Sequence, residues 1–110
     1  MRQALLQKMI FDLGFPKGLI SVEKKVGARR YDVACYSKSM EPLLLIECKA
    51  TELNASAIAQ AFGYNGTVKA PFICLASPTE IKTFWQAQGQ IASVPFLPMY
   101  AELDAISKRL

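Results

Sequence analysis

Two carboxylates and a lysine stand at positions that suit metal-assisted chemistry. Glu47 and Lys49 follow the apolar run Leu43 to Ile46, and Asp32 opens the apolar stretch that precedes this run. Four consecutive branched aliphatic residues predict a buried strand, and burying a charge without a partner is costly. We therefore expect Glu47 and Lys49 to lie where the strand leaves the core. Because side chains alternate along a strand, the two should project from the same face.

Asp32 joins them if residues 32 to 36 pair back on this strand through the polar stretch Ser37 to Glu41. The register that we expect has three directly opposed pairs: Tyr36 with Leu43, Ala34 with Leu45, and Asp32 with Glu47. Opposed residues have Cβ atoms about 5 Å apart on one face. Two carboxylates that close repel each other, so they call for a cation. An oxygen-lined site of this kind suits Mg²⁺ or Mn²⁺ better than zinc.

Composition narrows the chemistry further. The chain has 110 residues and no histidine, which excludes hydrolase triads that depend on imidazole. The three cysteines lack CxxC spacing and fall in apolar patterns, so we interpret them as buried thiols of a protein in a reducing compartment. We expect one domain over residues 1–110, no membrane segment and a cytoplasmic location.

The net charge is +4, and positive residues gather just before Asp32. These residues are Lys17, Lys24, Lys25, Arg29 and Arg30. A basic approach to a carboxylate pair suits a polyanionic substrate such as DNA, whose phosphates need neutralising. A solvated basic face is the alternative, and composition alone favours it.

The positioning elements follow from periodicity and turn residues. We expect helices over residues 2–13, 55–68 and 100–110, and strands over 19–26, 29–36, 43–49 and 71–76. Residues 81–86 form either a strand or a helical turn, and their Thr, Phe and Trp favour the strand. Two prolines between Ile91 and Met99 argue against a regular element there. The order predicts a mixed α/β sandwich.

The triplet Glu-x-Lys is weak evidence by itself, because it occurs at residues 23–25, 47–49 and 80–82. Only the copy at 47–49 follows a continuous apolar strand, has an aspartate that can sit opposite it, and precedes a predicted helix. This context favours Glu47 and Lys49 as functional groups over structural charges.

An acidic residue in the second strand and Glu-x-Lys ending the third resemble the PD-(D/E)XK nuclease superfamily. Four segments together resemble the N-terminal nuclease domain of type I restriction enzyme R subunits: residues 15–20 (FPKGLI), 30–33 (RYDV), 45–50 (LIECKA) and 60–64 (QAFGY). Gln60 and Tyr64 fit the Q-x-x-x-Y motif of those subunits and of RecB-type exonucleases, and their spacing places both on one helical face. By itself, this spacing would be better explained by an ordinary amphipathic helix.

The resemblance implies a restriction-endonuclease-like core, with a mixed sheet of about four to five strands flanked by helices. It also implies a Mg²⁺ or Mn²⁺ site formed by Asp32, Glu47 and the backbone carbonyl of Cys48, with Lys49 positioning or helping to deprotonate the attacking water. Gln60 and Tyr64 would contact DNA. Glu23 is either a further metal ligand or an exposed charge.

The expected function is therefore that of a metal-dependent DNA endonuclease. The alternative is a catalytically silent module of the same fold that binds DNA or a protein partner. The family commonly has Thr-Asn-Gly where this chain has Ser77-Pro78-Thr79, and the helicase motor of R subunits has no counterpart in these residues. We expect no translocation by this chain alone, and double-strand cleavage would need a homodimer or a helicase or restriction partner subunit.

Overall fold

A computed structural model describes residues 2–26, 29–49, 53 and 70–110, and for Val26, Arg29 and Arg30 it describes the backbone alone. The elements in chain order are α1 (Arg2–Phe11), a 3₁₀ turn (Lys17–Leu19), β1 (Ile20–Val26), β2 (Arg29–Tyr36), β3 (Pro42–Cys48), β4 (Phe72–Ala76), β5 (Ile81–Ala87), β6 (Gln90–Val94) and α3 (Tyr100–Ser107). The helix expected over 55–68 lies outside the described residues, as do Gln60 and Tyr64.

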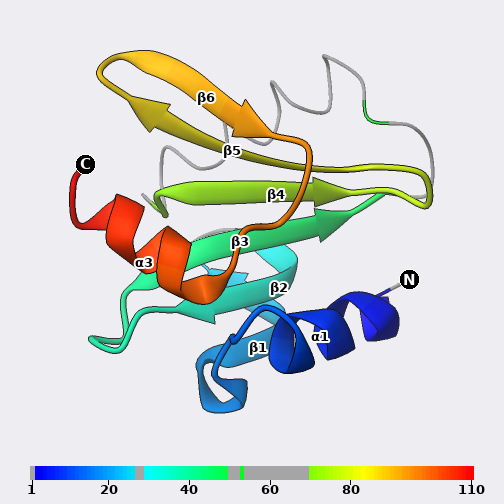
Figure 1. Cartoon of the computed structure of the whole chain (residues 1–110). Coiled ribbons are helices and arrows are strands. Elements are labelled where there is room, and N and C mark those ends of the chain that lie inside the picture. The colour runs from blue at the N-terminus through cyan, green and yellow to red at the C-terminus, as the bar shows by residue number, and fades with distance from the viewer. Residues whose placement is uncertain (1, 27–28, 50–52, 54–69) are drawn as a thin grey trace.

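The six strands form one sheet in the order β1-β2-β3-β4-β5-β6 (Figure 1). Neighbouring strands are antiparallel except β3 and β4, which are parallel. The carboxyl ends of β3 and β4 therefore meet at one end of the sheet. The mixed α/β class is as predicted, but the expected four to five strands were too few.

The additional strand is β6, and the expectation of irregular chain from Ile91 to Met99 was wrong for its first residues. Gln88 and Gly89 have φ of 53° and 78°, and positive φ at both central residues is the requirement of a type I′ hairpin turn. This turn returns the chain along β5, with Ala87 opposite Gln90. Pro95 and Pro98 both follow Val94, the last residue of β6, and so do not interrupt the strand.

The β2–β3 hairpin has the expected register over most of its length. Ala34 is opposite Leu45, as predicted, but Tyr36 is opposite Pro42 and not Leu43. The shift is a bulge in which Leu43 is the extra residue of β3. Leu43 consequently packs in the same buried cluster as Leu44, whereas regular strand alternation would place it on the face of Leu45.

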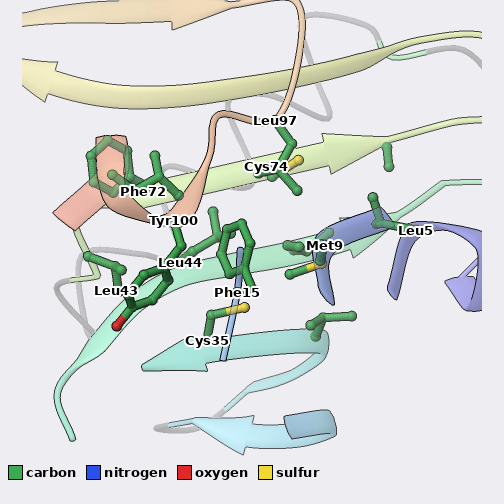
Figure 2. Close-up of a cluster of buried hydrophobic side chains, with 14 residues drawn as sticks. Leu5, Met9, Phe15, Cys35, Leu43, Leu44, Phe72, Cys74, Leu97 and Tyr100 are labelled. Atoms are coloured by element: carbon green, nitrogen blue, oxygen red, sulfur yellow. The ribbon is translucent and has the colours of Figure 1, made fainter. Parts of the chain in front are cut away.

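Both described helices pack on one face of the sheet. Leu5 and Met9 of α1 and Leu103 of α3 are buried there against residues of β2, β3 and β4, including Phe72 (Figure 2). Tyr100 ties the layer together: its backbone N–H donates to Leu13 O at 2.9 Å, and its hydroxyl donates to Tyr36 O at 3.1 Å.

The opposite face carries a second buried cluster, whose members are Tyr31, Ala34, Leu45, Ala70, Ile73, Leu75 and Phe84. Residues of β3, β4 and β5 thus alternate between two buried faces. This explains why β3 and β4 are almost continuously apolar.

The two edges of the sheet differ in chemistry. β1 carries Glu23, Lys24 and Lys25, whereas β6 carries no charged residue and exposes 57% of Ile91. In the part of the chain that the structure describes, no helix is long and apolar enough to cross a membrane.

Candidate active site

Glu47 lies next to the carboxyl end of β3, opposite Leu75 of the parallel strand β4. Only 8% of its surface is exposed, which is unusual for a carboxylate. By strand alternation its side chain projects from the face that carries Leu45 and Leu75. The interior strand β3 thus places the largely desolvated carboxylate of Glu47 at the end of the sheet.

Lys49 follows β3 directly and provides a cation beside this acid. Its Nζ atom is 3.6 Å from Oε2 of Glu47, so the two side chains share one face as predicted. The Lys49 side chain is 32% exposed, against 10% for Glu47. The Lys49 backbone N–H donates to Ala76 O at 2.6 Å, which fixes the residue to the end of β4.

Asp32 reaches the same strand end from β2. Its Oδ2 atom accepts a hydrogen bond of 2.7 Å from the backbone N–H of Cys48. The last described pair of the β2–β3 ladder is Val33 with Ile46, and Asp32 and Glu47 occupy the next position of that register. The carboxylate of Asp32 therefore lies beside the peptide that joins Glu47 to Cys48. Direct pairing of Asp32 with Glu47 stays a prediction.

Glu23 lies on the neighbouring strand β1, where its φ of 51° interrupts the extended backbone. Its carboxylate is 3.1 Å from Nη1 of Arg2, and its side chain is 61% exposed. Glu23 is thus engaged by helix α1. Its role as a metal ligand stays a prediction.

The structure describes the side chains of only two of the six residues expected to contact DNA. Lys24 and Lys25 are exposed on β1, which is the edge strand. The side chains of Arg29 and Arg30 are not described, and Gln60 and Tyr64 lie outside the described residues.

The pKa of the Cys48 thiol reflects the charges at this end of the sheet. Its pKa is raised, first by burial and then by the negative charge of Asp32, while Arg2 and the N-terminal amine act in the opposite direction. The beginning of α1 therefore lies near the end of β3, as Figure 1 also shows. The thiol stays protonated at neutral pH, and we assign it no nucleophilic role.

The sequence profile of the family described as "Type I restriction enzyme R protein N terminus" matches residues 1–98. The chain belongs to this family. A search of curated proteins found no match. Membership of this R protein N-terminal family is consistent with the resemblance to PD-(D/E)XK nucleases. The matched range, residues 1–98, contains Asp32, Glu47 and Lys49.

The donor set of this R protein N-terminal domain fits a hard divalent cation. Asp32 and Glu47 supply carboxylate oxygens near one peptide, and Mg²⁺ is commonly held by one or two carboxylates with water and phosphate as its other ligands. No group of three or more histidine, cysteine or acidic side chains converges in the described part of the chain. A metal here would take further oxygens from the Cys48 carbonyl, from water or from a substrate phosphate.

Two contacts near the site are not predicted by the sequence. Arg2 engages Glu23, and Ala76 O holds the backbone of Lys49. Both contacts join residues more than twenty positions apart, and no local pattern marks them. The parallel alignment of β3 and β4 was the missing information, because it brings Ala76 beside Lys49.

Proposed function

We propose that this chain is a metal-dependent deoxyribonuclease that hydrolyses phosphodiester bonds of DNA at the carboxyl end of β3. The observation that best supports this is the grouping of three side chains around two consecutive peptides. Asp32 accepts from the Cys48 N–H at 2.7 Å, and Lys49 lies 3.6 Å from Glu47. The name of the family, a type I restriction enzyme R protein, supports DNA as the substrate and another subunit of such an enzyme as a partner.

In this proposal Asp32 and Glu47 hold Mg²⁺ or Mn²⁺, with the carbonyl of Cys48 as a third protein ligand. When bound, the cation would polarise the scissile phosphate and lower the pKa of a coordinated water. Burial of Glu47 strengthens its interaction with a cation, because the local dielectric constant is lower than that of water.

Lys49 has a separate task. Its ammonium group offsets the charge that builds on the phosphate oxygens as water attacks, and it orients that water. The bond from the water oxygen to phosphorus forms as the bond from phosphorus to the leaving sugar oxygen breaks. The attacking water loses a proton to solvent, and the leaving oxygen takes a proton from solvent. The hydrogen bond from Lys49 N–H to Ala76 O reduces the freedom of the backbone that carries this side chain.

A second candidate function is DNA binding without cleavage. The exposed Lys24 and Lys25 on the edge strand favour it, because a basic edge binds phosphates whether or not a metal is held. It predicts an affinity for DNA that falls as salt rises, with no strand breaks. Gln60, Tyr64, Arg29 and Arg30 would serve as DNA contacts in both functions.

Incubation with supercoiled plasmid and with single-stranded DNA, in Mg²⁺, in Mn²⁺ and in EDTA, separates the two functions. Nicking or degradation that needs the metal and falls at least 100-fold in Lys49→Ala supports the nuclease. The matched control is Lys38→Ala, which removes the same charge from the exposed turn before β3. Equal activity in both variants would reject the assignment of Lys49.

A further inference from the structure

Lys82 lies in the same cross-strand row as Glu47. Glu47 is opposite Leu75 on β4, and Leu75 is opposite Lys82 on β5. Directly opposed residues project from the same face of a sheet. This row therefore directs a carboxylate and an ammonium group to one face, two strands apart.

The buried clusters verify this face independently. Phe84, two residues after Lys82 on β5, belongs to the cluster that contains Leu75. Ile81 and Trp85 pack against the cluster on the other face. Since alternate residues share a face, Lys82 projects with Phe84 toward the side of Glu47 and Lys49.

The charge of Lys82 is available to an anion. Lys49 pairs with Glu47 and Lys108 with Asp104, whereas no ion pair joins Lys82 to any residue that the structure describes. Lys82 is partly buried, and a lysine in such a position commonly packs its aliphatic stem against apolar surface and keeps its ammonium group in water. The acid closest to it in sequence, Glu80, lies in the exposed turn before β5.

We infer that Lys82 binds a backbone phosphate of the DNA strand near the phosphate that is cut. This inference rests on the proposed nuclease function. Neighbouring strands are about 4.8 Å apart, so two strand spacings separate Lys82 from Glu47 by roughly 10 Å. Phosphates of one DNA strand succeed each other by about 3.4 Å along the helix axis. Since successive phosphates are at least this far apart in space, the contacted phosphate is at most about three nucleotides from the scissile bond.

Such a contact adds binding energy without touching the reacting atoms. Lys82 is therefore a substrate-positioning residue and not a catalytic one. Its loss should raise KM and leave kcat nearly unchanged, because it acts on substrate and transition state alike. A residue needed only for folding would lower activity without such a selective rise in KM.

The test compares Lys82→Ala, Lys82→Arg and the control Lys38→Ala by DNA binding across a range of salt concentrations. Binding is measured in Ca²⁺, with gels verifying that the DNA remains intact. We expect Lys82→Ala to bind three- to tenfold more weakly and to lose about one unit from the slope of log K against log salt. Lys82→Arg should retain the wild-type slope, as should Lys38→Ala.

A second measurement locates the phosphate. A set of oligonucleotides carries one neutral methylphosphonate at successive positions from the cleaved bond. One position, at most about three nucleotides away, should weaken wild-type binding as much as Lys82→Ala does and have no further effect on that variant. Unchanged affinity and slope in Lys82→Ala would overturn this inference and leave the nuclease proposal standing. Absence of DNA binding by the wild type would overturn both.

Discussion

Oδ2 of Asp32 is 2.7 Å from the backbone nitrogen of Cys48, so one carboxylate touches the peptide that carries two other parts of the site. This peptide connects the acid of Glu47 to the residue whose carbonyl is a proposed metal ligand. Asp32 consequently has two physical roles, since it stabilises the end of the β2–β3 hairpin and presents charge to a cation. Substitutions can separate the two.

Asp32→Asn should preserve the fold and abolish cleavage. The amide oxygen still accepts from the Cys48 N–H, whereas the charge that attracts a cation is lost. Asp32→Ala should in addition destabilise the protein by about 2 kcal/mol, because a hydrogen bond to a charged acceptor is removed. Urea unfolding and plasmid nicking measure the two effects. Equal destabilisation by both variants would contradict the structural role.

Glu47→Gln should weaken Mg²⁺ binding at least tenfold, because it removes one of two ligating charges. Lys49→Ala should not weaken it, since the loss of a neighbouring cation favours a second cation at Glu47. Isothermal titration calorimetry of the DNA-free protein with Mg²⁺ measures the affinity of both variants for the metal. Weaker metal binding in Lys49→Ala would show that Lys49 supports the ligand geometry and does not act on the phosphate.

Glu23→Gln should change cleavage less than threefold. The Glu23 carboxylate is 61% exposed and engaged by Arg2, and an exposed ion pair contributes little to stability. Arg2→Gln is the matched variant, because it breaks the same contact from the other side. A loss of activity confined to Glu23→Gln would assign this residue to the metal site.

The buried thiols predict a loss of stability in alkali. Burial raises the pKa of Cys35 and of Cys74 to about 12 from an ordinary value of 9.0. Between these values the unfolded chain releases protons that the folded chain keeps, so the free energy of unfolding falls as pH rises from 9 toward 12. The fall is at most about 1.4 kcal/mol per pH unit for each thiol.

Cys35→Ala tests this linkage by denaturant unfolding at pH 8, 9 and 10. The variant should be less stable at pH 8, because it leaves a cavity, but its stability should decline less steeply above pH 9. An identical decline in both proteins would show that the Cys35 thiol does not contribute to the loss of stability.

Thr83→Val should destabilise the protein by about 1–2 kcal/mol. The Thr83 hydroxyl is fully buried and donates to Phe96 O at 2.8 Å, and valine of similar shape leaves that carbonyl without its donor. This bond fastens the segment after β6 to β5. Thr79→Val, at an exposed turn position, is the control and should stay within 0.5 kcal/mol of wild type in thermal or urea unfolding.

The strand ends were predictable because burial of charge is costly. A continuous aliphatic run followed by Glu47 and Lys49 leaves little choice about where the chain emerges from the core. The bulge at Leu43 was not predictable in the same way. Leu43 to Leu45 are identical, so hydrophobicity does not reveal which residue is extra, and a one-residue slip there only exchanges one buried face for another.

β6 was missed for a different reason. A proline restricts only its own position and the residue before it, so Pro95 and Pro98 do not prevent a strand that ends at Val94. The positive φ values at Gln88 and Gly89, which commit the chain to a hairpin, follow from the tertiary structure.

The contrast between the two edges of the sheet has a practical consequence for handling the protein. β1 ends the sheet with three consecutive charged residues, Glu23 to Lys25, and an interrupted backbone, which discourage another strand from adding to it. β6 ends it with neutral residues and an exposed isoleucine, and no strand among the described residues pairs with its outer edge, so the peptide groups there are an open template. We expect the protein to aggregate at high concentration by pairing of strands at β6. Ser93→Lys should reduce this aggregation.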